Sequence, residues 1–582
     1  MTTRQRRGGT AKTSISEKEP AESGGDIKTE CLDNYRCPMF LALFLVRLLG
    51  ACSQIINDCD EVYNYWEPLH LFLYEEGFQT WEYSPIYAIR SYFYIYLHYI
   101  PIVCLDHTRF SKATVFLLVR GFLAIFCCLG ELYAYKAIAK NIRTGRVFFI
   151  FTMFSSGVFQ ASPAFLPSSF CMTLTYFTLG AFLNERWTLG IFCVAFSTLV
   201  GWPFVAVLGL PFVVFMLYVK DLKFEFIVTS LLIGSSTALV QFLTDSYYFG
   251  KPVVASLNIV LYNVLSGPGP SLYGEESIIF YIKNLILNWN VAIFAFFAGV
   301  PLSFIAIRKA LKEGKLPTFL EANTPVVLLA VTAALWMVIF GAQAHKEERF
   351  LFPIYPLIAF IAAIVCEHVY DQWLNRISFK NLLICFFFGS FVLLSASRSF
   401  SVYRNYSGHV NIYSSLNEEL GNTEFSSDTV NRVCVGKEWH RFPSSFFIPK
   451  MDNSGRKVEF HFLQSEFRGL LPKPFKRGYS RIDSTRHEPT EMNNLNKEEV
   501  SRYVDLDSCN YVIDVDMPST EFEPNFRNMS DKWMVSASHP FIDVSKSSGF
   551  AGLLSAFYIP YFSEKVNKMT TYTLYRRIII EK

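Results

Sequence analysis

Charged residues are scarce in this sequence. Only 18% of the 582 residues are Asp, Glu, Lys or Arg, whereas 51% are hydrophobic. A soluble protein of ordinary composition is excluded on these grounds, and lipid is the expected solvent for much of the chain. The net charge is only +3, so no strongly basic surface points to nucleic acid as a partner.

Three further features are missing. The 13 Cys show no zinc-like spacing, which argues against a metal site built from cysteine. Residues 1–37 are polar and contain no apolar core, so they predict a disordered tail and not a cleavable signal peptide. No repeat of about 20–50 residues is visible, which disfavours a solenoid or a carrier array.

Long apolar runs dominate the chain up to residue 398. Bounded by charged residues or by Pro and Gly, they predict about eleven membrane spans. The runs are 39–57, 113–136, 147–162, 168–184, 188–201, 204–219, 224–243, 286–307, 324–342, 351–370 and 381–398. Several are shorter than the ~20 residues that cross a bilayer, so broken or re-entrant helices are expected among them.

Basic residues between the runs set the orientation. With eleven spans, all the basic breaks fall on one side, which is then cytoplasmic. They are residues 4–7, 140–146, 184–186, 220–223, 308–315 and 376–380. The amino terminus is therefore expected in the cytoplasm, and the segments 58–112, 244–285 and everything after about 398 on the lumenal side.

One segment, 86–105, is apolar enough to be a twelfth span, but counting it would reverse every later loop. Its many Tyr, with Arg90 and His98, are typical of a membrane interface. We predict that it lies along the lumenal interface; an ordinary span, with another span merged or missed, is the alternative.

The region after residue 398 predicts a separate domain of mixed α/β type. It is polar and contains the strand-like stretches 511–515 and 571–575. Cys434 and Cys509 lie in it and could pair if it is lumenal. Two sequons, at Asn405 and Asn528, would then be candidate N-glycosylation sites.

An acidic cluster follows the first apolar run directly. Asp58, Asp60, Glu61 and Glu67 place four carboxylates within ten residues at the edge of the membrane. Carboxylates so close to lipid are costly unless they are used or paired. One of them could be the base that accepts a hydroxyl proton during sugar transfer from a phosphate-activated donor. The alternative is a solvated helix end.

A second cluster, His345-Lys346-Glu347-Glu348-Arg349, lies between two apolar stretches. On the lumenal side these basic residues run against the usual bias of positive charge toward the cytoplasm. His345, Lys346 and Arg349 are candidates to bind the phosphate of the sugar donor. Arg would form bidentate hydrogen bonds to it, and Lys would act as a point charge. Glu347 and Glu348 are expected to orient those cations.

Several segments, taken together, resemble a known family. They are Asn64-Tyr65-Trp66-Glu67-Pro68-Leu69-His70, Phe78 to Pro85, Ala164 to Ser169, Gly201-Trp202-Pro203-Phe204 and His345 to Phe350. They look like the dolichyl-phosphate-mannose-dependent mannosyltransferases of glycosyltransferase family 22, which have the GT-C membrane fold. Gly436 to Phe446 and Ser465 to Phe475 resemble the members that form α-1,2 linkages in asparagine-linked glycan assembly.

That resemblance implies a fold and a location. It implies a polytopic α-helical membrane protein of GT-C type, with a catalytic domain over 38–398 and a lumenal carboxyl-terminal domain over 399–582. It also implies an endoplasmic reticulum enzyme whose active site faces the lumen.

The same resemblance implies the chemistry. The donor is dolichyl-phosphate mannose, the acceptor is a dolichyl-diphosphate-linked oligosaccharide, and the transfer inverts the anomeric centre. GT-C enzymes place a catalytic acidic residue in the first lumenal loop. Asp60, Asp58 and Glu61 are therefore the candidates for the base, with Asp60 favoured and Glu67 in support. No metal or other cofactor is required by this scheme.

Other readings remain open at this stage. An α-1,6-mannosyltransferase or a mannosyltransferase of glycolipid-anchor synthesis would share the membrane motifs, although the carboxyl-region segments argue against both. A lipid or sugar transporter would show similar hydropathy, but it usually carries charges within its spans.

Overall fold

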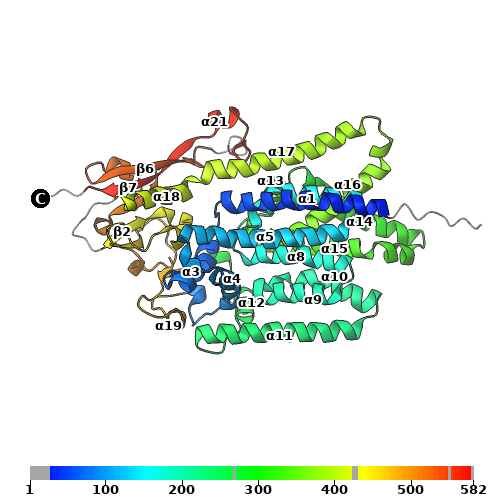
Figure 1. The fold of residues 1–582 in the computed structure, drawn as a ribbon, viewed down its shortest axis with the longest axis horizontal. Coiled ribbons are helices and arrows are strands. Elements are labelled where there is room, and N and C mark those ends of the chain that lie inside the picture. The colour runs from blue at the N-terminus through cyan, green and yellow to red at the C-terminus, as the bar shows by residue number, and fades with distance from the viewer. Residues whose placement is uncertain (1–25, 266–269, 423–429, 548–551, 553, 579–582) are drawn as a thin grey trace, which may run out of the picture.

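The structure, a computed structural model, describes residues 26–265, 270–422, 430–547, 552 and 554–578. A long helical half and a smaller α/β half lie end to end, with the strands gathered at one end of the molecule (Figure 1). The principal helices of the long half are α1 (Asp26–Ser53), α5 (Lys112–Ile138), α6 (Ile142–Phe154), α7 (Ser156–Ala161), α8 (Pro167–Leu183), α9 (Trp187–Phe196), α10 (Leu210–Val214), α11 (Lys223–Phe249), α14 (Ala292–Lys312), α15 (Leu316–Ala342), α16 (Tyr355–Gln372) and α17 (Lys380–Tyr406).

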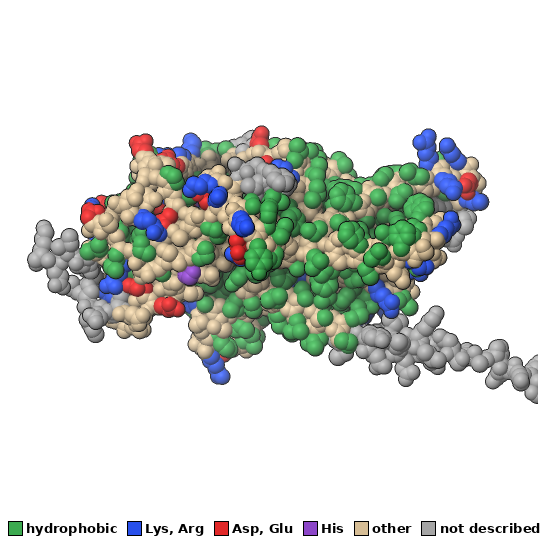
Figure 2. All heavy atoms as spheres, turned by 90° about the horizontal axis from the view of Figure 1, so that it is seen from above, with side chains coloured by type: hydrophobic (Ala, Val, Ile, Leu, Met, Phe, Trp, Pro, Cys, Tyr) green, Lys and Arg blue, Asp and Glu red, His purple; other side chains and the backbone are tan. Residues whose placement is uncertain are grey.

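The protein is a multi-pass membrane protein. Within the described residues, six helical segments are long and apolar enough to cross a bilayer: 112–138, 223–249, 292–312, 323–342, 348–376 and 380–406. Figure 2 shows hydrophobic side chains covering much of one face of the helical half. Shorter apolar helices accompany the six segments, and the expected count of about eleven spans stays a prediction.

The expected broken helices are present. After α9 the chain makes a wide π-helical turn over Ser197–Gly201, then a tight 3₁₀ stretch over Pro203–Gly209, before α10 begins. Pro203 has no amide hydrogen and disfavours helix at Trp202, whose backbone is extended. Two short apolar runs therefore replace one regular helix.

A buried ion pair fastens α1 into the helical half. Arg47 donates to Glu131 of α5 at 2.7 and 2.8 Å, and to the carbonyl oxygen of Thr152 in α6 at 2.7 Å. Both charged side chains are essentially unexposed. A charge inside a span is tolerated only when it is paired in this way.

The basic breaks within the described residues, from 140–146 onward, lie at one end, as the positive-inside pattern predicted. α5 starts beside the α/β half, where the Lys112 ammonium donates to the Ile448 carbonyl at 3.2 Å, so its carboxyl end lies far from that half. There Arg143 pairs with Asp371 at the end of α16. Figure 2 shows Lys and Arg side chains at the end that lies away from the strands of Figure 1.

Two segments contain more helix than expected. α1 begins at Asp26, so residues 26–37 are helical although they were predicted to be a disordered tail. This stretch contains neither Gly nor Pro, the two residues that disfavour helix most. Residues 1–25 lie outside the described part. The segment 244–285 contains α12 (Ala255–Leu265) and the start of α13 (Ile278–Trp289).

The segment 86–105 forms α4 (Tyr92–Cys104), a helix of 13 residues. This is shorter than the ~20 residues needed to cross a bilayer. Asp245 at the end of α11 accepts hydrogen bonds from the Ser91 hydroxyl at 2.9 Å and the Phe93 amide at 3.0 Å, at the start of α4. These lengths and contacts fit the predicted interfacial helix.

The carboxyl-terminal half is the predicted α/β domain. Its five strands run in the order β3-β2-β5-β7-β6, with β2 parallel to both β3 and β5 and the other pairs antiparallel. Their bounds are β2 (Val430–Val435), β3 (Lys457–Phe462), β5 (Tyr511–Val515), β6 (Trp533–Ile542) and β7 (Met569–Arg577). Helix α18 (Gly408–Gly421) packs on β6 and β7. The strands expected at 511–515 and 571–575 are confirmed.

Cys434 and Cys509, which the sequence left as a possible pair, form a disulfide. Cys434 lies in β2 and Cys509 just precedes the neighbouring β5, so the bond joins adjacent strands across 75 residues of chain. Both residues are fully buried beside Phe526 and Trp533.

We expect Cys434→Ser with Cys509→Ser to lower the stability of the carboxyl-terminal domain by about 2–4 kcal/mol, because a long loop is freed in the unfolded chain. Hydrogen exchange of the β2 and β5 amides measures this opening. Cys385→Ser, at an exposed free cysteine, is the matched control. Equal protection in both variants would contradict the prediction.

Candidate active site

A cavity of about 1000 Å³ lies where the helical half meets the carboxyl-terminal domain. Six parts of the chain line it: the first loop after α1, the segment between α7 and α8, the break at Trp202 and Phe204, the region from α12 to α13, the region from the end of α15 to α16, and loops of the carboxyl-terminal domain. Both charged clusters noted in the sequence open into this one cavity. It is therefore the candidate active site.

The first loop is shaped by a short cap. The Asp58 side chain accepts a hydrogen bond from the Asp60 amide at 2.9 Å and starts the short helix α2 (Cys59–Glu61). Asp is a favoured capping residue because it satisfies an amide that the helix leaves free. The turn holds the Asp58 and Asp60 carboxylates close enough for one cation to reach both.

That cation is Arg349, which lies 289 residues further along the chain. Its guanidinium nitrogens lie 3.1 Å from an Asp58 oxygen and 2.5 Å from an Asp60 oxygen, and it also pairs with Glu347. Its side chain is only 12% exposed, so these ion pairs are shielded from solvent. The two predicted clusters thus form one network.

The two aspartates are not equivalent. Both oxygens of Asp58 are engaged, one by the Asp60 amide and the other by Arg349. Burial raises the pKa of Asp58 to about 7, and Arg349 only partly opposes this. Asp60 is more exposed, at 39%, and within the described residues its Oδ1 makes no hydrogen bond. Asp60 therefore keeps an oxygen free to accept a proton.

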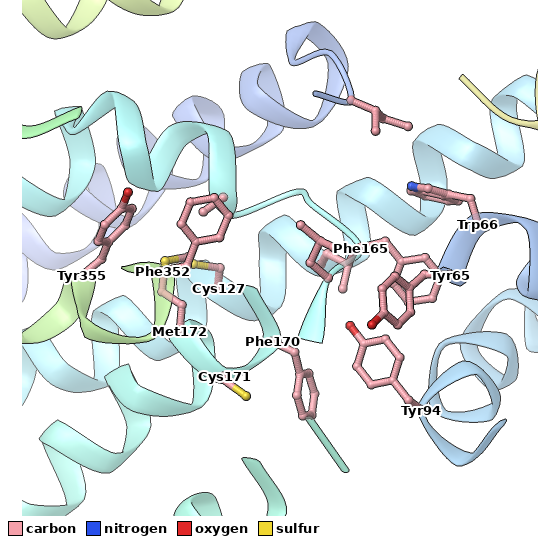
Figure 3. Packing of buried hydrophobic residues seen from close by; sticks show 14 of the residues in the cluster. Tyr65, Trp66, Tyr94, Cys127, Phe165, Phe170, Cys171, Met172, Phe352 and Tyr355 are labelled. Atoms are coloured by element: carbon pink, nitrogen blue, oxygen red, sulfur yellow. The ribbon is translucent and has the colours of Figure 1, made fainter. Parts of the chain in front are cut away.

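Glu61, the third candidate for the base, has a structural role. One of its oxygens accepts hydrogen bonds from the Trp66 indole at 3.0 Å and the Phe165 amide at 2.9 Å. Burial raises the pKa of Glu61. Trp66, Phe165 and Tyr94 pack beside it as an aromatic cluster (Figure 3). Glu61 thus ties the first loop to the loop before α8.

His345 and Lys346 have local partners. The His345 ring contacts the Gly274 carbonyl at 2.8 Å and Glu347 at 2.7 Å, and the hydrogen bond to Glu347 raises the pKa of His345. The Lys346 ammonium donates to the Glu276 carbonyl at 2.7 Å and to the Gln343 carbonyl. Lys346 therefore fastens the connection before α13, a role that its charge alone did not reveal.

The two glutamates of this cluster differ. Burial disfavours ionisation of Glu347, but Arg349 and His345 outweigh it and lower its pKa to about 2, so it orients both cations as an anion. Glu348 instead accepts a hydrogen bond from the Asn288 side chain at 2.6 Å. Glu348 therefore links this segment to α13.

Glu67 joins the first loop to the carboxyl-terminal domain. It is fully buried and accepts hydrogen bonds from the Ser444 hydroxyl at 2.8 Å, the Ser445 amide and hydroxyl at 2.7 Å each, and the Phe78 amide at 3.0 Å. Four hydrogen-bond donors compensate the cost of burying this carboxylate away from water. Glu67 positions the site without reaching the cavity.

Other cavity residues were not predicted. Arg90 donates to Glu82 and to the Tyr65 hydroxyl, both at 2.8 Å, on the wall beside Asp60. Trp439 and Phe467 come from the carboxyl-terminal domain. The segments that contain Glu82, Trp439 and Phe467 carried the family resemblance, which was the available signal, but no periodicity placed them at a site.

Asp58, Cys59 and Asp60 bring three ligand atoms within 4.8 Å of one another, as a metal site would require. Arg349 already contacts both carboxylates, however, and supplies the neutralising charge. This donor set therefore suits a guanidinium-bridged acid pair.

The Alg9-like mannosyltransferase family matches residues 38–449. The chain is 60% identical to "Alpha-1,2-mannosyltransferase algn-9" of Caenorhabditis elegans over 93% of this chain and 90% of that protein. It is 42% identical to "Alpha-1,2-mannosyltransferase ALG9" of Mus musculus, over 92% and 88%. Among solved structures, ArnT from Cupriavidus metallidurans bound to undecaprenyl phosphate is similar at a TM-score of 0.47 and 11% identity, over 82% of this chain and 92% of that one.

The family match spans the first loop with its aspartates, the segment with Arg349, and the loop with Ser444 and Ser445 that Glu67 binds. Most of the cavity lining thus lies within the matched region, and the chain belongs to the Alg9-like mannosyltransferase family.

Proposed function

We propose that this chain transfers mannose from dolichyl-phosphate mannose, in α-1,2 linkage, to a dolichyl-diphosphate-linked oligosaccharide during assembly of the N-glycan precursor. The curated relatives that cover most of the chain are named α-1,2-mannosyltransferases, which favours this linkage over the α-1,6 alternative. The observation that carries the proposal is the cavity in which Arg349 bridges Asp58 and Asp60 while Asp60 keeps one oxygen free.

The reaction is a single in-line displacement. The 2-hydroxyl oxygen of the acceptor mannose forms a bond to the anomeric carbon of the donor mannose, and the bond from that carbon to the phosphate oxygen breaks. The hydroxyl proton passes to Asp60, which acts as general base. The bonding electron pair leaves with the phosphate. One displacement converts a β-linked donor into an α-linked product.

Arg349 stabilises the departing phosphate in this scheme. Its guanidinium can form paired hydrogen bonds to phosphate, and in this structure it forms ion pairs with both aspartates. His345 and the remaining N–H of Lys346 add positive charge on the same wall. The scheme calls for no metal ion, because the phosphate leaves as a stable anion.

An aromatic wall suits the lipid chain of the donor. Trp202 packs against Phe340 and Phe350 with ring centroids 5.1 Å apart in each case, and all three line the cavity. Phe340 belongs to α15, one of the helices long enough to span a bilayer. The phosphate-binding cations therefore lie next to an apolar surface, as a lipid-linked phosphate requires.

We place the protein in the endoplasmic reticulum membrane with the cavity on the lumenal side. The basic loops lie at the opposite end of the helical half, in keeping with a cytoplasmic position. The disulfide fits an oxidising compartment for the carboxyl-terminal domain.

Asp60→Asn should reduce transfer of labelled mannose from dolichyl-phosphate mannose by about 10²–10⁴-fold, because the base is removed. The assay uses purified protein and a lipid-linked oligosaccharide acceptor, with Asp58→Asn and Glu61→Gln measured in parallel. Near-normal turnover by the Asp60 variant, with a lost activity for the Asp58 variant, would move the role of base to Asp58.

The Michaelis constant for the donor should rise with pH above about 7. The raised pKa of Asp58 means that it is protonated below that pH, and an anionic donor phosphate nearby favours the protonated form further. Donor binding then takes up a proton, so affinity falls by up to about tenfold per pH unit as pH increases.

Asp58→Asn should flatten this pH profile, whereas Asp531→Asn, at an exposed position, should leave it unchanged. Initial rates at several donor concentrations between pH 6 and pH 8.5 give the profile. A slope that persists in the Asp58 variant would refute the assignment.

The two sequons should differ in glycosylation. Asn528 is exposed, whereas Asn405 is 3% exposed and its amide donates to the Ser401 hydroxyl and the Ser555 carbonyl. We expect Asn528→Gln to abolish an endoglycosidase-sensitive shift in gel mobility and Asn405→Gln to leave it intact. The reverse pattern would show that the region around Asn405 packs differently in the cell.

A further inference from the structure

The wall that the carboxyl-terminal domain contributes to the cavity carries no Asp, Glu, Lys or Arg among the described residues. It consists of Trp439, His440, Phe467, Leu470 to Pro472 and Asn496. Burial and the nearby Arg441 lower the pKa of His440, so this ring is neutral at neutral pH. The aspartates and Arg349 line other parts of the cavity, in the first loop and in the segment before α16. The cavity is thus divided between a charged side and an uncharged side.

Two aromatic rings form the main surface of the uncharged wall. Trp439 and Phe467 have ring centroids 4.5 Å apart with their planes tilted by 38°, and both side chains are only half-buried. Aromatic rings that stay partly open to a polar cavity offer a flat apolar face to a ligand. Sugar rings present C–H groups on one face that suit such contact, with hydroxyls at the edges for hydrogen bonds.

The Trp439 loop is held rigidly next to the reacting groups. Its carbonyl oxygen accepts a hydrogen bond at 2.8 Å from the hydroxyl of Tyr63, three residues after Asp60. The preceding residue, Glu438, is buried and pairs with Arg441 at 2.8 and 2.9 Å. A ligand on Trp439 would therefore lie at a fixed spacing from the base.

The Phe467 loop is also tightly built. A Cβ on Gly469 would lie 2.3 Å from the end of the Phe467 ring and 2.6 Å from the side-chain oxygen of Asn496. That oxygen accepts a hydrogen bond from the Leu470 amide at 2.9 Å. Only glycine lets this loop close beneath the ring, so Phe467 is set in place by the loop that carries it.

We propose that this uncharged wall is the subsite for the neutral mannose residues of the acceptor that precede the reacting sugar, with Trp439 as the stacking surface. The inference rests on the proposed function. Mannose residues carry no net charge, and their C–H faces can pack against the rings of Trp439 and Phe467. The His440 Nδ1 contacts the Lys437 carbonyl at 2.9 Å, which leaves Nε2 for a sugar hydroxyl.

The test compares two acceptors in steady-state transfer by the full-length protein. One is a lipid-linked oligosaccharide with its complete mannose branch, and the other is shortened so that only the reacting mannose remains on that branch. Trp439→Ala should raise the Michaelis constant for the long acceptor about three- to tenfold, and should leave those for the short acceptor and the donor unchanged.

Three variants make the comparison specific. Trp439→Phe should restore most of the preference for the long acceptor, because a flat ring remains. Phe467→Leu should weaken the preference without changing the charged wall. Trp373→Ala is the matched control, since that indole is 58% exposed and belongs to the segment after α16 at the other end of the molecule. Thermal unfolding of each variant checks that it is folded.

The outcomes separate the two proposals. Wild-type protein that transfers no mannose to either acceptor would overturn the proposed function and the subsite with it. Wild-type protein that prefers the long acceptor, beside a folded Trp439→Ala variant that keeps the same preference, would overturn the subsite alone. An equal loss for both acceptors would assign Trp439 to support of the catalytic groups instead, which also refutes the subsite.

Discussion

The contact between Arg349 and the aspartate pair is the interaction on which the site depends. It brings together a loop that follows α1 and a segment that precedes α16, and it compensates two carboxylates that the cavity would otherwise leave costly. The same contact serves both substrates in the proposed reaction. A guanidinium that bridges two carboxylates in the free protein can turn to a phosphate when the donor arrives, which changes the environment of Asp58 and Asp60 at that moment.

Around this contact, buried polar side chains fix the geometry in place of long regular elements. Glu61 holds the loop before α8, Glu67 holds the loop with Ser444 and Ser445, and Lys346 holds the connection before α13. Each of these charged groups is largely buried and satisfied by named partners. The residues of the site therefore lie on irregular backbone that packs against the helical half. Within the helical half, Arg47 and Glu131 form a similar buried ion pair.

Local chemistry explains how much the sequence could predict. Apolar runs, basic breaks, the strands at 511–515 and 571–575 and the cysteine pair followed from periodicity, charge and compartment, and the structure bears out these strands and this pair. The sequence marked both charged clusters, but their direct pairing through Arg349 was not predicted. The helical stretch 26–37 was missed, since polar composition does not distinguish a helix from a coil. The roles of Glu61 and Lys346 were missed because Lys346 donates to backbone carbonyls and Glu61 accepts from the Phe165 amide as well as the Trp66 indole, and a backbone partner carries no sequence signature.

The separation along the chain between Asp60 and Arg349, 289 residues, also bears on biosynthesis. While the ribosome is still producing the early segments, the acidic loop has no cation to pair with, and Glu67 lacks the serines that lie 377 and 378 residues further on. The nascent protein must therefore carry the Asp60 and Glu67 carboxylates without these partners through most of translation. Assembly of a competent enzyme is therefore a late event, and a truncated product that ends before the carboxyl-terminal domain would hold its donor-binding cations yet leave Glu67 without its partners.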